Sequence, residues 1–152
     1  MKTALLFLLF LSFVWFNFPA TSAAQKQTTD ALHTPPKGDP ERKAIMDALR
    51  DNYRQQSGSG ISVIFQVNYL KVHNGWAWAD VTPLDEKGKA VAEGGPSLLH
   101  NENDMWKVID LSVIPEDPNN PQGAFDPDAK FIKEVQKRWA GVPADIFPKR
   151  KK

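Results

Sequence analysis

A helical period of apolar residues appears twice in the chain. The first run starts at Asp39, a residue type suited to an N-cap, with Pro40 at the first helical position, and it stops at Ser57-Gly58. Its apolar stripe consists of Ile45, Met46, Ala48, Leu49 and Tyr53. The second run starts at Asp126-Pro127-Asp128, which repeats the capping pattern, and it ends at Gly141. Its stripe consists of Phe131, Ile132, Val135 and Trp139. Both runs are typical of amphipathic helices that cover a sheet.

Between these helices, apolar and polar residues alternate with the period of a β-strand. Over residues 61–67 every odd position is apolar, and the apolar phase then moves to Leu70 and Val72. Without a correction, such a shift would turn half of the strand's core side chains to water. We therefore expect a β-bulge in the region from Gln66 to Tyr69.

Asn74-Gly75 follows this strand and fits a two-residue type I′ hairpin turn, which requires positive φ at both positions. The turn fixes the register of the hairpin. On one face it pairs His73 with Trp76, Lys71 with Trp78 and Tyr69 with Asp80. On the other face it pairs Val72 with Ala77 and Leu70 with Ala79.

A second hairpin is predicted from Leu98, through a polar turn at 101–104, to a last strand that ends at Val113. Apolar side chains lie on both faces of that strand, so we expect both faces to be covered. The element order predicts an α+β fold, in which an N-terminal helix packs on a bent antiparallel sheet of about four strands and a C-terminal helix follows.

The bulged first strand and the closing sequence Met105-Trp106-Lys107-Val108-Ile109-Asp110-Leu111 resemble the cystatin-like and NTF2-like class of cone-shaped sheets. Gly75-Trp76-Ala77-Trp78, followed by Leu98-Leu99 and Trp106-Lys107-Val108, is also similar to small exported bacterial proteins of unknown function. The resemblance spans residues 39–148 and rests on structural motifs. It carries over no catalytic residues.

Residues 1–24 have the organisation of a signal peptide. Lys2 precedes an apolar stretch over residues 4–16, and Ser22 and Ala24 are small enough for cleavage before Gln25. The alternative is a membrane anchor, but the apolar stretch is shorter than the roughly 20 residues that cross a bilayer. The chain has no cysteine to carry a lipid. We expect an exported protein with no stable membrane span after cleavage, located in the periplasm, with an extracellular location as the alternative.

The rest of the chain divides into a linker, a domain and a tail. Residues 25–38 contain few apolar side chains and are expected to form a flexible linker. Residues 39–148 are expected to form a single α+β domain, and residues 149–152 a basic tail. Four basic side chains without an aromatic stacking platform make a weak nucleic-acid footprint, so no nucleic acid is expected as a partner.

Several common catalytic sites are missing from the sequence. It has no cysteine, and it lacks both a nucleophile elbow and a glycine-rich phosphate loop. The three histidines, His33, His73 and His100, do not have the spacing of metal ligands. We expect no catalytic residues, no metal and no cofactor. An acid–base pair between His73 or His100 and Asp80 or Asp110 depends on the register and stays open.

One face of the first hairpin is the candidate partner-binding surface. Its residues are Tyr69, Lys71, His73, Trp76, Trp78 and Asp80. If exposed, this aromatic area with polar edges would suit a protein, peptide or glycan of the cell envelope. The alternative is that the second helix and residues 142–148 cover it, which the rarity of large exposed aromatic patches favours.

A second hypothesis places a small-molecule pocket between the first helix and the concave sheet. Its lining would be Met46, Tyr53, Phe65 and Leu111. The alternative is a core in which Tyr53 and Phe65 fill that space. The sequence thus predicts an exported, non-catalytic binding or interaction protein of the cell envelope. A small-molecule-binding domain of the cone fold, with weak enzymatic activity, is the alternative.

Overall fold

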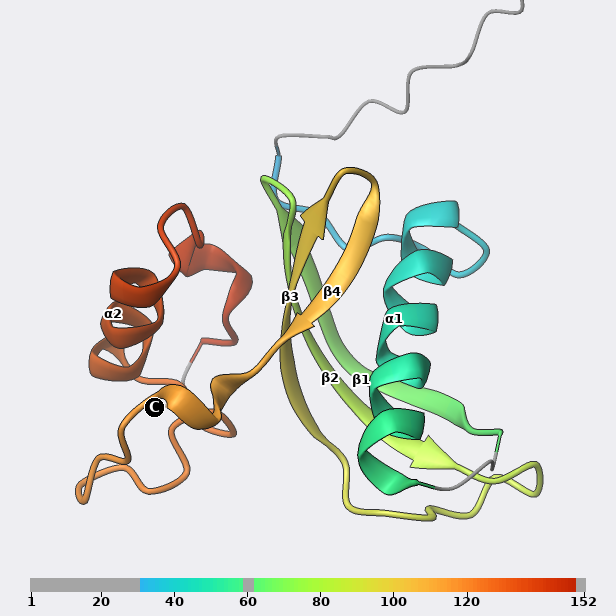
Figure 1. The fold of residues 1–152 in the computed structure, drawn as a ribbon. Coiled ribbons are helices and arrows are strands. Elements are labelled where there is room, and N and C mark those ends of the chain that lie inside the picture. The colour runs from blue at the N-terminus through green and yellow to red at the C-terminus, as the bar shows by residue number, and fades with distance from the viewer. Residues whose placement is uncertain (1–30, 59–61, 150–152) are drawn as a thin grey trace, which may run out of the picture.

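A bent antiparallel sheet lies between two helical layers (Figure 1). The computed structural model describes residues 31–58 and 62–149. The sheet has four strands in the order β1-β2-β3-β4. Their bounds are β1 Ile64–His73, β2 Trp76–Leu84, β3 Gly95–Glu102 and β4 Met105–Ile109. The predicted α+β fold is confirmed. The expected signal peptide, residues 25–30 of the expected linker and the last three residues of the basic tail lie outside the described residues.

Helix α1, Pro40–Ser57, covers one face of the sheet as predicted (Figure 1). The Asp39 carboxylate caps it by accepting a hydrogen bond from the Glu41 backbone N–H at 2.7 Å. Gly58 ends it with a φ of 60°, and its N–H donates to the Arg54 carbonyl. Ile45 and Leu49 are buried against the sheet.

The β-bulge and the hairpin turn are both present. The register of β1 against β2 shifts between Val67 and Tyr69, so apolar residues before and after the shift face α1. Asn74 and Gly75 have φ values of 49° and 72°, which the type I′ turn requires. All five predicted cross-strand pairs are confirmed.

Strand β2 contributes alternate residues to two cores. Ala77 and Ala79 lie in the first core together with the buried side chains of α1. Trp76 and Trp78 lie in the second core, on the opposite face. Helix α2, Ala129–Arg138, and the 3-10 turn η2, Ala144–Ile146, cover that face (Figure 1).

Strand β4 is shorter than predicted. It stops at Ile109, because the Asp110 carboxylate accepts a hydrogen bond from the Ser112 N–H at 2.9 Å and starts the 3-10 turn η1, Leu111–Val113. The expectation that both faces of β4 are covered holds only in part. Trp106 packs in the first core, whereas on the other face Ile109 packs against the second core and Met105 and Lys107 are exposed.

The N-cap of α2 is Asp128, and the expectation of a helix start at Asp126 is wrong. The Asp128 carboxylate accepts hydrogen bonds from the N–H groups of Lys130 and Phe131 at 3.0 and 2.8 Å. Asp126 belongs instead to the preceding turn, in which its N–H donates to the Gln122 carbonyl at 2.9 Å. The apolar stripe predicted for this helix does pack on the second core.

Residues 31–38, the described part of the expected linker, lie against the domain. The backbone groups of His33 and Val72 exchange two hydrogen bonds of 2.9 Å, which adds a short bridge to the free edge of β1. The Thr34 hydroxyl donates to the Leu70 carbonyl at 2.9 Å, and Pro35 is fully buried. The described part of the expected linker therefore lies along the edge of the sheet, where the backbone groups of β1 supply its hydrogen-bond partners. We call residues 31–38 the N-terminal arm.

Candidate functional site

The aromatic face of the first hairpin is covered. Trp76 is 6% exposed and Trp78 is 1% exposed. The Phe147 ring lies 4.7 Å from the Trp78 ring, and the Phe131 ring approaches it edge-on at 6.3 Å. The covered alternative is therefore confirmed, and the six candidate residues do not form an open recognition surface.

Two of the polar residues at the border of this face, His73 and Asp80, have hydrogen-bond partners. His73 Nδ1 lies 2.8 Å from the Asp145 carboxylate of η2, which ties the covering segment to the sheet. Asp80 accepts a hydrogen bond from the Asn68 amide at 3.3 Å. Tyr69 is half-buried, and burial, with a smaller effect of the Asp145 charge, raises the pKa of its hydroxyl. Lys71 is half-buried at the same border.

The acid–base pairs left open by the sequence do not form. His73 is paired with Asp145, as described above. The His100 ring stacks on Trp76 with 3.9 Å between centroids, and its Nδ1 lies 3.4 Å from the Glu102 carboxylate. Asp110 is used to cap η1. Within residues 31–58 and 62–149, no three His, Asp or Glu side chains are grouped to hold a metal ion.

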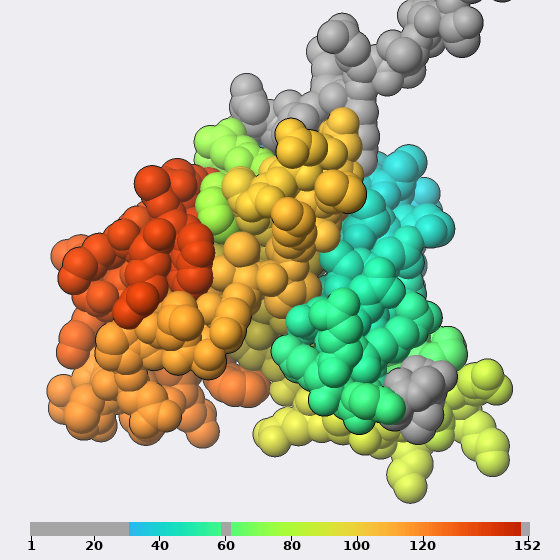
Figure 2. Space-filling view, viewed as in Figure 1, coloured from blue at the N-terminus to red at the C-terminus, as the bar shows by residue number. Residues whose placement is uncertain are grey.

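A groove lies between the C-terminal half of α1 and the sheet. It consists of two hollows of about 260 and 170 Å³. Both are lined by Asn52, Gln56, Pro96 and Ser97. Tyr53 and Phe65 line the smaller hollow, whereas Met46 is buried in the first core. Figure 2 shows this side of the molecule, with α1 facing the segment that follows β4. We call this pair of hollows the α1 groove.

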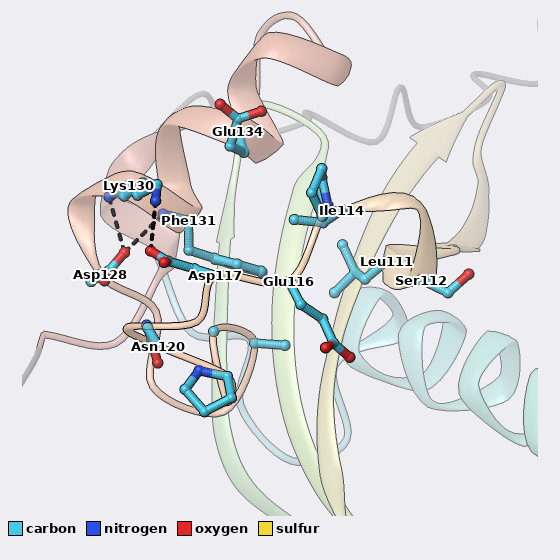
Figure 3. Close-up of a pocket in the computed structure, with 14 residues that line it drawn as sticks. Leu111, Ser112, Ile114, Glu116, Asp117, Asn120, Asp128, Lys130, Phe131 and Glu134 are labelled. Atoms are coloured by element: carbon cyan, nitrogen blue, oxygen red, sulfur yellow. Dashed lines mark hydrogen bonds and ion pairs between the residues drawn. The ribbon is translucent and has the colours of Figure 1, made fainter.

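A third hollow, of about 280 Å³, lies on the other side of the sheet (Figure 3). Three consecutive parts of the chain enclose it: η1, residues 114–124, and the first two turns of α2. Its apolar side chains are Leu111, Ile114, Ala124 and Phe131, all of which also pack against the second core. We call this cavity the α2 hollow.

Hydrogen bonds fix the loop that forms the wall of the α2 hollow. Asn120 is buried; its N–H donates to the Asp117 carbonyl at 2.9 Å and its side-chain amide to the Asp126 carbonyl at 3.1 Å. Gly123 lies against the Phe131 ring, so closely that an added Cβ would be 2.8 Å from a ring carbon. The hollow is thus preformed, because loop and helix are held together beside it.

Two carboxylates of the α2 hollow are engaged in structural contacts. Asp117 forms an ion pair of 2.9 Å with Lys130, and this contact holds the pKa of Asp117 below its usual range and raises that of Lys130. Asp128 caps α2 through two backbone N–H groups. These two side chains shape the rim.

The other two carboxylates of the hollow are available to a ligand. Among the residues that the structure describes, Glu116 has no hydrogen bond or ion pair. Glu134 has a long ion pair of 3.9 Å with Lys137. In Figure 3, these two side chains lie on opposite sides of Phe131.

The sequence did not predict the α2 hollow. Residues 115–127 contain four prolines and read as a stiff connection, and the acids at Glu116 and Asp117 lack the spacing of a calcium loop. A proline-rich segment has no hydrophobic period, so its packing against Phe131 left no signal. The combination of adjacent acids with a flanking amphipathic helix was the only indication.

No family model, curated protein or solved structure matches the chain. The class of this protein is therefore described from its own structure: it is an α+β domain with a covered aromatic core and a preformed hollow beside that core. The resemblance to cystatin-like and NTF2-like proteins stays a prediction. No helix within the described ranges is long and apolar enough to cross a bilayer.

Proposed function

We propose that this chain is an exported, non-catalytic binding protein of the cell envelope, and that it holds a small amphipathic molecule in the α2 hollow. One observation carries the proposal: the preformed α2 hollow is lined both by apolar side chains and by two available carboxylates. Its volume is close to the lower end of the roughly 300–1,000 Å³ found for ligand pockets. Export is proposed from the organisation of residues 1–24.

The apolar side chains that line the hollow support binding of a ligand. Phe131 and Ile114 are only half-buried there, although both contact the second core. A ligand that covered them would remove apolar surface from water, which stabilises a complex by about 25 cal/mol per Å² before the entropic cost of association.

The titratable groups of the hollow support a non-catalytic role. A general acid or base works best with a pKa near the operating pH. The ion pair with Lys130 moves the pKa of Asp117 away from neutrality, and Asp128 is held in the cap of α2. No histidine lines the hollow among the described residues.

Backbone NMR of the ¹⁵N-labelled protein tests this proposal. A set of small molecules with one apolar and one polar end would be titrated singly. We expect saturable shifts confined to residues 111–134. An Ala124→Phe variant, which fills the hollow, should lose them, whereas Ala92→Phe, an exposed site in another loop, should keep them. Absence of saturable shifts for the whole set would contradict the proposal.

The α1 groove is the second candidate site, and it corresponds to a small-molecule-binding domain of the cone fold with weak enzymatic activity. The observation in its favour is that its two hollows share four lining residues. The same titration separates the two sites. Saturable shifts at Tyr53 and Ser97, retained in the Ala124→Phe variant, would favour the groove over the α2 hollow.

A further inference from the structure

We infer that the ligand of the α2 hollow is an organic cation: an amine or quaternary ammonium group attached to an apolar body. The inference rests on the proposed function and adds the chemical class of the ligand. Two properties of the hollow lead to it, its shape and its charge.

The shape selects the apolar body. The Phe131 ring and the Ile114 side chain both line the hollow, and we call these two side chains its floor (Figure 3). A phenyl or short alkyl group can cover this floor, since aromatic rings pack well edge-on or offset against one another. The volume of about 280 Å³ is ample for a body of this size, since a cavity of roughly 150 Å³ already holds benzene.

The charge selects the cation. Four carboxylates, those of Glu116, Asp117, Asp128 and Glu134, line the hollow together with one ammonium group, that of Lys130. The pairing of Lys130 with Asp117 leaves the surroundings negative. An anionic ligand would meet like charge on several sides, and a neutral one would leave Glu116 and Glu134 to water.

Glu116 and Glu134 are the groups that would hold the ammonium ion. Neither forms a short ion pair, and in Figure 3 their carboxylate groups point away from Phe131. With one of these side chains turned toward the hollow, a bound ammonium group would form a charge-assisted hydrogen bond to its carboxylate while the apolar body covers Phe131. The pairing is stronger beside an apolar floor than in open water, because the local dielectric constant is lower.

Calorimetric titration with a matched series of probes tests the inference. The probes are 2-phenylethylammonium, 2-phenylethanol and 3-phenylpropionate, which share a phenyl body and differ in charge. We expect the ammonium compound to bind about tenfold more tightly than the alcohol, and the carboxylate to bind more weakly than both. Added salt should weaken binding of the ammonium compound and leave that of the alcohol unchanged.

Charge-removing variants locate the effect. A Glu116→Gln, Glu134→Gln double variant should bind the ammonium compound and the alcohol equally. Glu86→Gln, the same substitution at an exposed site in another loop, should keep the wild-type preference. Circular dichroism of each variant checks that the fold is retained.

The outcomes separate the inference from the proposed function. If the alcohol binds as tightly as the ammonium compound, or if the double variant keeps the preference, the inference is wrong while the hollow remains a binding site. If no saturable shifts are seen for any molecule in the NMR titrations, the proposed function fails as well.

Discussion

At the scale of single residues, His33 holds the N-terminal arm to α1. Its Nδ1 lies 2.8 Å from the Ala31 carbonyl oxygen and its Nε2 lies 2.6 Å from the Glu41 carboxylate. Both neighbours accept hydrogen bonds, so the geometry suits an imidazolium that donates from both nitrogens. Burial alone would lower the pKa of His33, but these hydrogen bonds and the charges of Glu41 and Asp39 raise it above 6.5.

Protonation of His33 should therefore stabilise the folded protein. Because the folded-state pKa is raised, this contribution is complete below pH 6.5 and is lost as the pH rises through the higher folded-state value. We expect the free energy of unfolding of the wild type to exceed that of His33→Ala most below pH 6.5, by at most about 1 kcal/mol. Urea unfolding at several pH values measures the difference, in which contributions of groups that do not interact with His33 cancel. A difference that grows above pH 7 would contradict this assignment.

The structural roles of residues with strong local preferences, such as helix caps and turn residues, could be predicted from the sequence. Asp39 caps α1 as predicted, and Asn74-Gly75 fixed the register of a whole hairpin. The same rules placed the cap of α2 at Asp126 instead of Asp128, because both residues precede the apolar stripe. The choice depends on the turn that ties Asp126 to Gln122, which is a tertiary feature of the loop.

At the scale of elements, the segment after α2 is what closes the second core. Phe147 is 3% exposed and contacts Trp78, and Ile146 is fully buried. This cover consists of a short 3-10 turn and extended chain, so it depends on side-chain burial more than on its own hydrogen bonds.

Truncating Phe147 should consequently open the cover. We expect Phe147→Ala to lower the free energy of unfolding by about 3–5 kcal/mol, as for other buried aromatic residues. Acrylamide should also quench tryptophan fluorescence more strongly in this variant. Phe125→Ala serves as the control, since Phe125 is 61% exposed, and it should change stability by less than about 1 kcal/mol. Equal effects of the two substitutions would contradict the covered arrangement.

Periodic elements were predictable and non-periodic ones were not. The helices, the bulge and the first hairpin follow from apolar spacing, which the sequence displays directly. The N-terminal arm binds Val72 through backbone groups, and these leave no side-chain pattern to detect. For the same physical reason, the walls of the α2 hollow were unforeseen, because they are formed by a proline-rich loop.

At the scale of the whole molecule, the sheet is a wall shared by two cores. Neighbouring residues of β2 alternate between them, with Ala77 and Ala79 on one side and Trp76 and Trp78 on the other. Loss of either core would expose one full face of the same four strands. The two cores are therefore expected to unfold together.

Methyl NMR during urea unfolding measures this coupling. Signals of Ile45 and Leu49 report on the first core, and those of Val135 and Ile146 on the second. We expect one common midpoint for all four residues. Two separate midpoints would show that the cores are independent units.

The most direct test of ligand binding in the α2 hollow is a crystal structure of the protein grown with 2-phenylethylammonium. We expect the phenyl ring over Phe131 and Ile114, with the ammonium nitrogen within about 3 Å of the Glu116 or Glu134 carboxylate. A structure in which this ligand occupies the α1 groove, or in which side chains close the α2 hollow, would contradict the proposal.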